Sequence, residues 1–164
     1  MSTRLVVGIG ELAVTAARRA EIVTHALGSC VAVCVWDGKA RLGGMLHFML
    51  PDSAVNPERA LKQPGTFADT GIPLLLRAAF RLGADKSHLR VVLLGGAATV
   101  ACGAGPLDIG TQNAAAARHF VSQHGLGIHA ESLGGTTART VTLSVDNGRV
   151  QIDSGRDLIE ELQP

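Results

Sequence analysis

Two apolar stretches flank a turn signal in the first third of the chain. The first covers residues 31–36 and the second lies within residues 39–51, with Asp37-Gly38 between them. Asp-Gly between apolar runs predicts a two-residue β-hairpin loop, because such turns need residues that tolerate positive φ angles. With that loop length, Trp36 pairs with Lys39.

This pairing places Cys30 opposite Met45, and His47 lies two residues farther along the second strand. Cys30 and His47 then point to the same face of the hairpin, as diagonal neighbours with Cα atoms about 7–8 Å apart. A loop one residue longer, or a bulge at Gly43-Gly44, would reverse that parity. The pattern therefore predicts a Cys–His pair on one face, on condition that the register holds.

The remaining pattern predicts more strands and a few helices. Continuous or alternating apolar runs predict strands at 4–9, 91–94 and 128–132, and a second hairpin from 140–145 and 149–152 around Asp146-Asn147-Gly148. One helix should begin at Asp69 or Thr70 and end at Gly83. A second should run from Thr111 or Asn113 to about Gln123, and a short terminal helix should cover 157–162.

Three stretches give weaker signals. Residues 13–19 fit a strand or a loop, 52–67 fit a long polar surface loop, and the Gly- and Ala-rich stretch 95–110 fits a close-packed loop. The order of strands, helix, strand, helix and strands predicts an α+β fold. In such a fold a few helices cover mixed sheet, without repeated βαβ units.

Cys30 and His47 suggest nucleophilic chemistry if they converge. A cysteine attacks as its thiolate, and a histidine within hydrogen-bond reach can take the thiol proton and return it to a leaving amine. Gly28 and Ser29 precede the cysteine and are candidates for offering backbone N–H groups to an oxyanion. The alternative is a buried cysteine on a strand with an unrelated histidine nearby.

Composition narrows the class of protein. The 164 residues suit a single domain over 1–164, and a net charge of +1 without a basic, aromatic-rich cluster argues against nucleic-acid binding. Three cysteines form no regular framework, so we expect a reducing compartment. No apolar run suits a signal peptide or a membrane span, which predicts a cytoplasmic protein without membrane insertion. The histidines and cysteines show no metal-ligand spacing, and no cofactor motif is convincing.

Several motifs together resemble one protein family. The string Leu27-Gly28-Ser29-Cys30-Val31-Ala32-Val33-Cys34, followed by Gly43-Gly44-Met45-Leu46-His47-Phe48-Met49-Leu50-Pro51, closely resembles the chemoreceptor glutamine deamidases, CheD. Further matches are Gly95-Gly96-Ala97, Ile109-Gly110 with Asn113, and Gly134-Gly135 with Arg139. The sequence differs from the family pattern at Leu94, Gln112 and Ala138, and these are not predicted catalytic positions.

The resemblance implies a cysteine hydrolase that converts receptor glutamines to glutamates through a thioester. By motif position its catalytic cysteine, histidine and threonine correspond to Cys30, His47 and Thr24. It also implies a sandwich of two mixed β-sheets with helices on one side, related to deamidating toxins. Methyl-accepting chemotaxis receptors would be the substrate, and the CheC phosphatase the regulatory partner where it is present. Two alternatives are an idle adaptor that binds receptors or CheC, and a cysteine hydrolase of receptor methyl esters.

Overall fold

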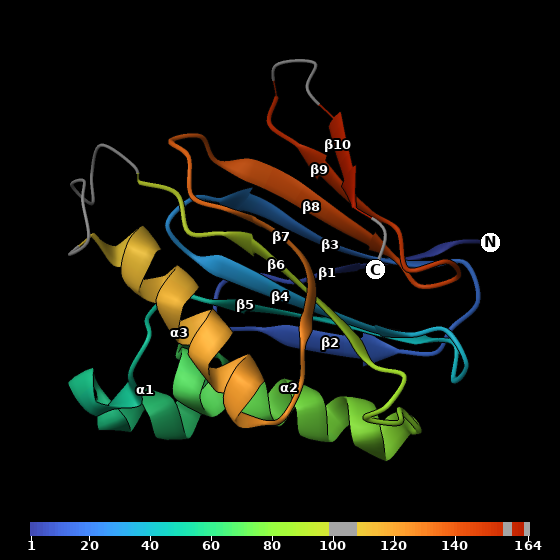
Figure 1. The fold of residues 1–164 in the computed structure, drawn as a ribbon, viewed down its shortest axis with the longest axis horizontal. Coiled ribbons are helices and arrows are strands. Elements are labelled where there is room, and N and C mark those ends of the chain that lie inside the picture. Colours follow the sequence, from blue (N-terminus) through green and yellow to red (C-terminus); the bar gives the residue numbers. More distant parts are fainter. Residues whose placement is uncertain (99–107, 156–158, 163–164) are drawn as a thin grey trace.

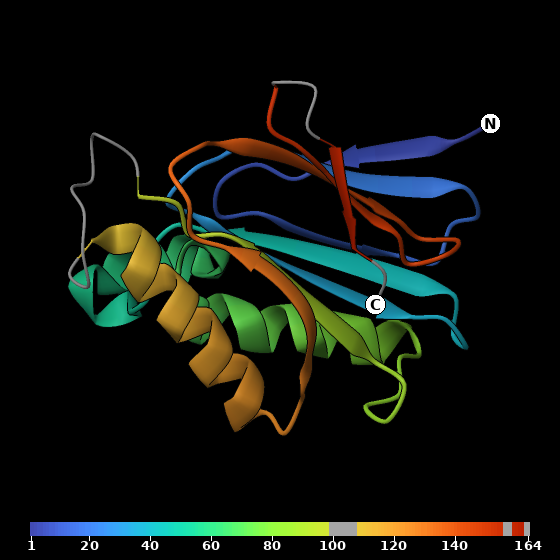
Figure 2. The same cartoon turned by 45° about the horizontal axis from the view of Figure 1, so that its top comes forward.

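The computed structural model describes residues 1–98, 108–155 and 159–162. Two five-stranded sheets pack face to face, and the helices lie against the outer face of the second sheet (Figure 1). Figure 2, turned by 45°, shows the same three layers, with α2 and α3 on one side only. This arrangement confirms the expected α+β sandwich of two mixed sheets with helices on one side.

The first sheet has the strand order β1-β3-β8-β9-β10. Its strands are β1 (Thr3–Val6), β3 (Ala20–Leu27), β8 (Arg139–Ser144), β9 (Val150–Asp153) and β10 (Ile159–Leu162). The β1–β3 pair is parallel and the other pairs are antiparallel, so the sheet is mixed.

The second sheet has the order β2-β5-β4-β6-β7. Its strands are β2 (Leu12–Thr15), β5 (Leu42–Phe48), β4 (Val31–Asp37), β6 (Arg90–Gly95) and β7 (Ile128–Leu133). Only the β6–β7 pair is parallel. Strands β4, β5 and β6 are buried almost throughout because both of their faces are covered.

Two apolar cores follow from the two-residue period of these strands. One core lies between the sheets and includes Ala32, Cys34 and Met45. The other lies under the helices and includes Val33, Leu46 and Phe48. Alternate residues of β4 and β5 thus enter different cores, which puts His47 on the side of the inter-sheet core.

The helices are η1 (Ser53–Val55), α1 (Pro57–Lys62), η2 (Pro64–Thr66), α2 (Ala68–Leu82) and α3 (Ile109–Gln123). The expected α2 is confirmed, but it begins at Ala68 with Phe67 as its N-cap, not at Asp69 or Thr70. It ends at Gly83 with a φ of +115°, a value that is strained for residues other than glycine. The expected second helix is also confirmed, but its cap is Asp108, whose carboxylate accepts the Thr111 N–H.

Two sequence predictions of secondary structure were wrong. Residues 52–67 form η1, α1 and η2 instead of a surface loop, and Asn56 caps α1 ahead of Pro57 at its first turn. The described part of the expected terminal helix is β10, which pairs with β9 as an antiparallel edge strand. The second hairpin, formed by β8 and β9, is confirmed.

The register of the first hairpin also differs from the prediction. Asp37 pairs with Leu42, so the loop has four residues, and Cys34, not Cys30, lies opposite Met45. The cause is the buried Asp37 carboxylate, which accepts the N–H groups of Lys39, Ala40 and Asp85, each at 2.9 Å. The last of these donors comes from a distant segment, which a local turn signal cannot reveal.

Within the described ranges, the helices are all too short or too polar to cross a membrane.

Replacing Asp37 with alanine should lower the free energy of unfolding by about 1–3 kcal/mol, because three backbone donors lose a charged acceptor. Burial raises the pKa of Asp37, but hydrogen bonds from the Ala40, Asp85 and Lys39 backbones outweigh it, so the pKa lies below the ordinary value. The stabilisation is therefore present above about pH 4 and is lost as the pH falls through the lower folded-state pKa. Urea unfolding at pH 7 and pH 3 measures it.

Asp52→Ala is the matched control, since this exposed carboxylate accepts a single local N–H from Ala54. It should cost under about 1 kcal/mol at either pH. Equal losses for the two variants would contradict the role given to Asp37.

Candidate active site

A buried hydrogen-bond relay joins the two sheets. The Thr24 hydroxyl on β3 lies 2.7 Å from Nδ1 of His47 on β5, and it donates to the Val7 carbonyl oxygen at 2.6 Å. Both side chains are almost fully buried, with exposed fractions of 0% for Thr24 and 1% for His47. The relay therefore runs through the inter-sheet space, away from bulk water.

The relay assigns the tautomer of the imidazole. A hydroxyl carries one hydrogen, and the Thr24 hydrogen is committed to the Val7 carbonyl, which can only accept. Thr24 must then accept its second bond from His47, so Nδ1 carries the ring proton and Nε2 keeps a lone pair. Among the described residues, Nε2 has no hydrogen-bond partner. The imidazole is thus prepared to accept a proton at Nε2.

The protonation state agrees with this assignment. Burial lowers the pKa of His47 to about 4, because a low-dielectric interior disfavours the charged imidazolium. The ring is therefore neutral at pH 7. A neutral imidazole is the form that can act as a general base.

Cys30 lies on the same side of the sheet as His47. Ala32 pairs directly with His47, and Cys30 is two positions before Ala32, so the two-residue period directs both toward the inter-sheet side. Cys30 is partly exposed and packs against the edge of the inter-sheet core. The predicted register was wrong, but the predicted shared face was right, because the shift moved the pairing by an even number of residues.

A β-bulge in β3 and residues 95–97 at the end of β6, here called the strap, shape the segment that leads to Cys30. The register of β3 against β8 shifts between Thr24 and Leu27, where Ala26 takes a φ of +53°, so β3 carries a bulge just before its end. Gly28 and Cys30 then use their carbonyl oxygens to accept N–H groups from Ala97, at 2.9 Å, and Gly96, at 2.8 Å.

Gly95 makes this strap possible. A Cβ atom on Gly95 would lie 2.3 Å from the Cys30 carbonyl oxygen, and its φ of +104° is unfavourable for other residues. The sequence therefore needs glycine here to bring the end of β6 against the Cys30 backbone. The oxyanion role predicted for the N–H groups of Gly28 and Ser29 stays a prediction.

Asn113 of α3 reaches the same segment from the helix layer. Its fully buried amide nitrogen donates to the carbonyl oxygens of Ser29, at 2.9 Å, and Met49, at 2.8 Å. These carbonyls belong to the segment of Cys30 and to the chain just beyond β5. One side chain thus bridges the two elements that carry the predicted nucleophile and base.

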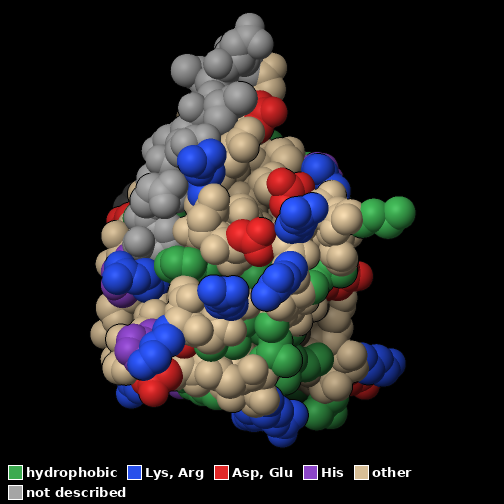
Figure 3. Space-filling model, turned by 90° about the vertical axis from the view of Figure 1, so that its right-hand side faces the viewer, with side chains coloured by type: hydrophobic (Ala, Val, Ile, Leu, Met, Phe, Trp, Pro, Cys, Tyr) green, Lys and Arg blue, Asp and Glu red, His purple; other side chains and the backbone are tan. Residues whose placement is uncertain are grey.

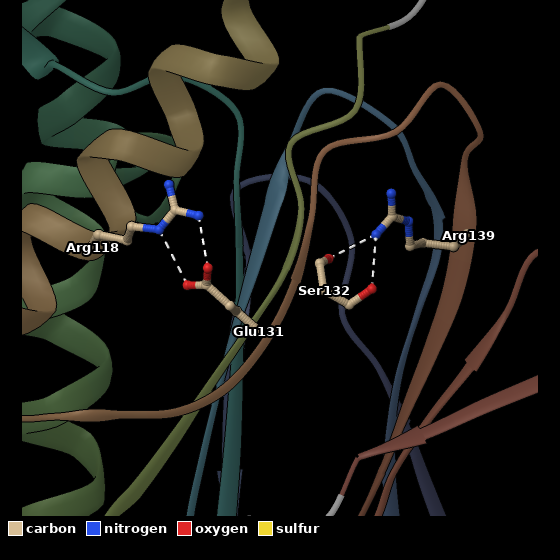
Figure 4. A network of polar contacts seen from close by, with 4 residues as sticks. All are labelled: Arg118, Glu131, Ser132 and Arg139. Carbon is tan, nitrogen blue, oxygen red and sulfur yellow. Dashed lines mark hydrogen bonds and ion pairs between the residues drawn. The ribbon is translucent and has the colours of Figure 1, made fainter.

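Arg139 holds the end of β7 and the residues that follow it through hydrogen bonds, and Figure 4 shows those to Ser132. From β8 of the first sheet, its guanidinium donates to the Ser132 carbonyl at 2.7 Å, to the Ser132 hydroxyl, and to the Gly134 carbonyl. The N–H of Gly134 in turn donates to the Gly95 carbonyl. The strap behind Cys30 is therefore held from both sheets.

An ion pair, also drawn in Figure 4, joins the helix layer to the edge strand of the second sheet. Arg118 of α3 donates to the Glu131 carboxylate of β7 through two nitrogens, at 2.8 and 3.1 Å. Both side chains are substantially exposed, so this pair contributes little to stability.

The other sequence candidates are placed away from this chemistry. Cys34 is buried in the inter-sheet core, and burial raises the pKa of its thiol to about 12, so it stays protonated. His25 is exposed, and Cys102 lies outside the described residues. The described segments contain no group of three or more His, Cys, Asp or Glu side chains arranged to hold a metal ion.

A separate hollow lies at the opposite, turn-bearing end of the sandwich. It has a volume of about 760 Å³, and its lining includes Arg18, Arg19, Arg41, Trp36 and Asp146. Figure 3 faces this end of the molecule and shows Lys and Arg side chains gathered over it. The lining contains none of the predicted catalytic residues, so we place the candidate active site at the Cys30 end.

Some functional features were not visible in the sequence. The Val7 carbonyl that fixes the Thr24 hydroxyl is a backbone group, and no side-chain motif indicates it. The sequence offers Asn113 as a motif match and as a possible start of the second helix, but without a role in the site. Its contacts with the Ser29 and Met49 carbonyls depend on how α3 packs against the second sheet.

Comparisons with known proteins give one consistent family. The family model described as CheD chemotactic sensory transduction matches residues 49–154. The chain is 52% identical to a probable chemoreceptor glutamine deamidase CheD 2 from Anaeromyxobacter dehalogenans, covering 91% of this chain and 93% of the relative. It is 41% identical to a probable chemoreceptor glutamine deamidase CheD from Methanococcus maripaludis, covering 94% of this chain and 97% of the relative.

The buried imidazole predicts a specific dependence of stability on pH. The folded-state pKa of about 4 lies below the ordinary value of 6.5, so the unfolded chain binds more protons between these values. Lowering the pH from 7 to 4 should therefore cost the wild type about 3 kcal/mol through this residue. His47→Gln should lack that loss, and urea unfolding across this pH range measures the difference.

His129→Gln is the control, because His129 is exposed on β7. This variant should keep the wild-type loss of stability. A His47→Gln curve that runs parallel to the wild-type curve would contradict the burial of a neutral imidazole.

Proposed function

The chain belongs to the CheD family, and we propose that it is a chemoreceptor glutamine deamidase whose nucleophile is Cys30, whose base is His47 and whose orienting residue is Thr24. The relay from the Val7 carbonyl through Thr24 to His47 is the observation that best supports these roles. It leaves Nε2 of a neutral imidazole as the proton acceptor, on the side of the sheet that Cys30 shares.

In the first stage, Nε2 of His47 takes the thiol proton and the Cys30 sulfur attacks the side-chain carbonyl carbon of a glutamine. A C–S bond forms, and the carbonyl oxygen takes up negative charge in a tetrahedral intermediate. When this intermediate collapses, the C–N bond breaks and the imidazolium gives its proton to the leaving nitrogen. Ammonia departs and a thioester to Cys30 remains.

In the second stage, His47 removes a proton from water and the hydroxide attacks the thioester. The C–S bond breaks, the sulfur regains a proton, and the glutamine has become a glutamate. The balance is one amide plus one water giving one carboxylate and one ammonium ion. Gly28 and Ser29 are the proposed sources of N–H groups for the oxyanion in both stages.

Thr24 supports both stages by orientation. Because its hydroxyl accepts from Nδ1–H, the ring cannot rotate or exchange tautomers without losing a buried hydrogen bond. This is the task of the third residue in other triads. Threonine keeps the relay neutral, whereas a carboxylate there would favour a charged imidazolium.

The proposed substrate is a glutamine on a helical segment of a methyl-accepting chemotaxis receptor. Each turnover adds one negative charge to the receptor helix, which changes repulsion between neighbouring charges and can bias signalling. The proposed setting is the cytoplasm, and the CheC phosphatase is the proposed regulatory partner.

Cys30→Ala should lower ammonia release from a receptor cytoplasmic fragment by at least about 10³-fold, because the variant cannot form the thioester. Mass spectrometry of the fragment should show a gain of about 1 Da at selected glutamines with the wild type only. Cys34→Ala is the matched control, since it removes a second thiol that burial keeps protonated.

Unchanged turnover by Cys30→Ala would overturn the assignment of the nucleophile. A wild type that binds the fragment but never alters its mass would favour the idle adaptor. Loss of methyl groups without ammonia release would favour ester hydrolysis.

A further inference from the structure

We infer that Asn113 is a positioning residue for the deamidation reaction. Its side-chain amide fixes the segment that carries Cys30 relative to the chain that carries His47. This inference rests on the proposed function, in which these two residues react together.

The main evidence is where the β4–β5 ladder begins. Its first pair is Val31 with Phe48, so Cys30 and Met49 lie just beyond it. Cys30 therefore lies just outside the hydrogen-bonded ladder, whereas His47 lies within it. The ladder alone does not set the position of Cys30 against His47.

Asn113 supplies the missing connection. The two hydrogens of its Nδ2 atom go to the Ser29 carbonyl, at 2.9 Å, and the Met49 carbonyl, at 2.8 Å. Ser29 is bonded to Cys30, and Met49 follows His47 by two residues. Because an amide group is planar, these two bonds hold the two carbonyls at a defined separation.

The first turn of α3 packs closely against the strap, and this brings Asn113 to both carbonyls. One turn before Asn113, a Cβ atom on Gly110 would lie 2.3 Å from the Ala97 carbonyl oxygen and 2.6 Å from that of Gly96. Only glycine lets the start of α3 come so close to the strap that holds Cys30. Asn113 is fully buried as a result.

The side-chain oxygen of Asn113 argues against a role in packing alone. Within the described residues, two buried side-chain atoms lack a hydrogen-bond partner, and these are Oδ1 of Asn113 and Nε2 of His47. Buried unsatisfied polar atoms are rare in folded proteins and often mark functional sites. An apolar residue at position 113 would avoid the cost of the unsatisfied Oδ1 atom, but it could not donate hydrogen bonds to the Ser29 and Met49 carbonyls.

The test compares Asn113→Ala and the isosteric Asn113→Asp with wild type in the full-length protein. The first readout is the rate at which iodoacetamide alkylates Cys30 between pH 5 and pH 10, followed by mass spectrometry of the Cys30 peptide. Both variants should slow alkylation at pH 7 by about 10- to 100-fold, because a misplaced thiol loses its base. The pH of half-maximal alkylation should rise.

The second readout is deamidation of a receptor cytoplasmic fragment. Here kcat should fall by about 10- to 100-fold while KM changes by less than about twofold, since Asn113 aligns reacting groups without binding substrate.

Val121→Ala is the matched control, because it removes two buried methyl groups from the same helix without touching either carbonyl. It should lower the stability of α3 and keep the wild-type alkylation profile. If Val121→Ala shifts that profile as far as Asn113→Ala does, Asn113 acts only through helix stability and the inference fails. It also fails if both Asn113 variants keep the wild-type profile.

The outcome for the proposed function is separate. If the wild type never deamidates the fragment but Asn113→Ala still slows alkylation of Cys30, the positioning role stands and the proposed function fails. If the wild type deamidates and Asn113→Ala retains its kcat, the proposed function stands and the positioning role fails.

Discussion

The hydrogen bond between Thr24 and His47 is the contact on which the candidate site depends. It crosses the interior of the sandwich, so it exists only when the two sheets are packed and correctly aligned. The Val7 carbonyl removes the freedom of the Thr24 hydroxyl, and this fixes which imidazole nitrogen carries the proton. The packing of the two sheets thereby determines which nitrogen of the His47 ring carries the proton.

The proposed reaction also needs the Cys30 segment to be held in place, and other parts of the fold hold it. The strap at Gly96 and Ala97 holds the Cys30 segment from the second sheet, while Asn113 holds it from α3. Cys30 itself sits at the end of a strand, where the ladder no longer constrains it. Cys30 is partly exposed whereas His47 is deeply buried, which suits the proposed attack on a protein substrate, because only the thiol must reach the glutamine.

The sequence predicted the parts of this site that depend on local chemistry and period. The prediction that Cys30 and His47 share a face was right although the predicted register was wrong. Side chains alternate between faces with a period of two, and the observed register differs from the predicted one by an even number of residues. The error itself arose because Asp37 binds an N–H from Asp85, a contact no local rule contains. Thr24 was identified from family resemblance, since a threonine in a strand has no signal that reveals a partner in the opposite sheet. Asn56-Pro57 is a good helix start, but η1 and α1 bury none of their residues, so no apolar period distinguishes this polar stretch from a loop.

The central claim is that Thr24 holds His47 as the neutral tautomer protonated at Nδ1. Nitrogen-15 NMR of protein labelled at histidine measures this directly between pH 5.5 and pH 8. The account predicts a protonated-type shift at Nδ1 and an unprotonated-type shift at Nε2 for His47 throughout this range, and loss of that preference in Thr24→Val but not in Thr24→Ser. A His47 ring protonated at Nε2, or charged at pH 7, would contradict it.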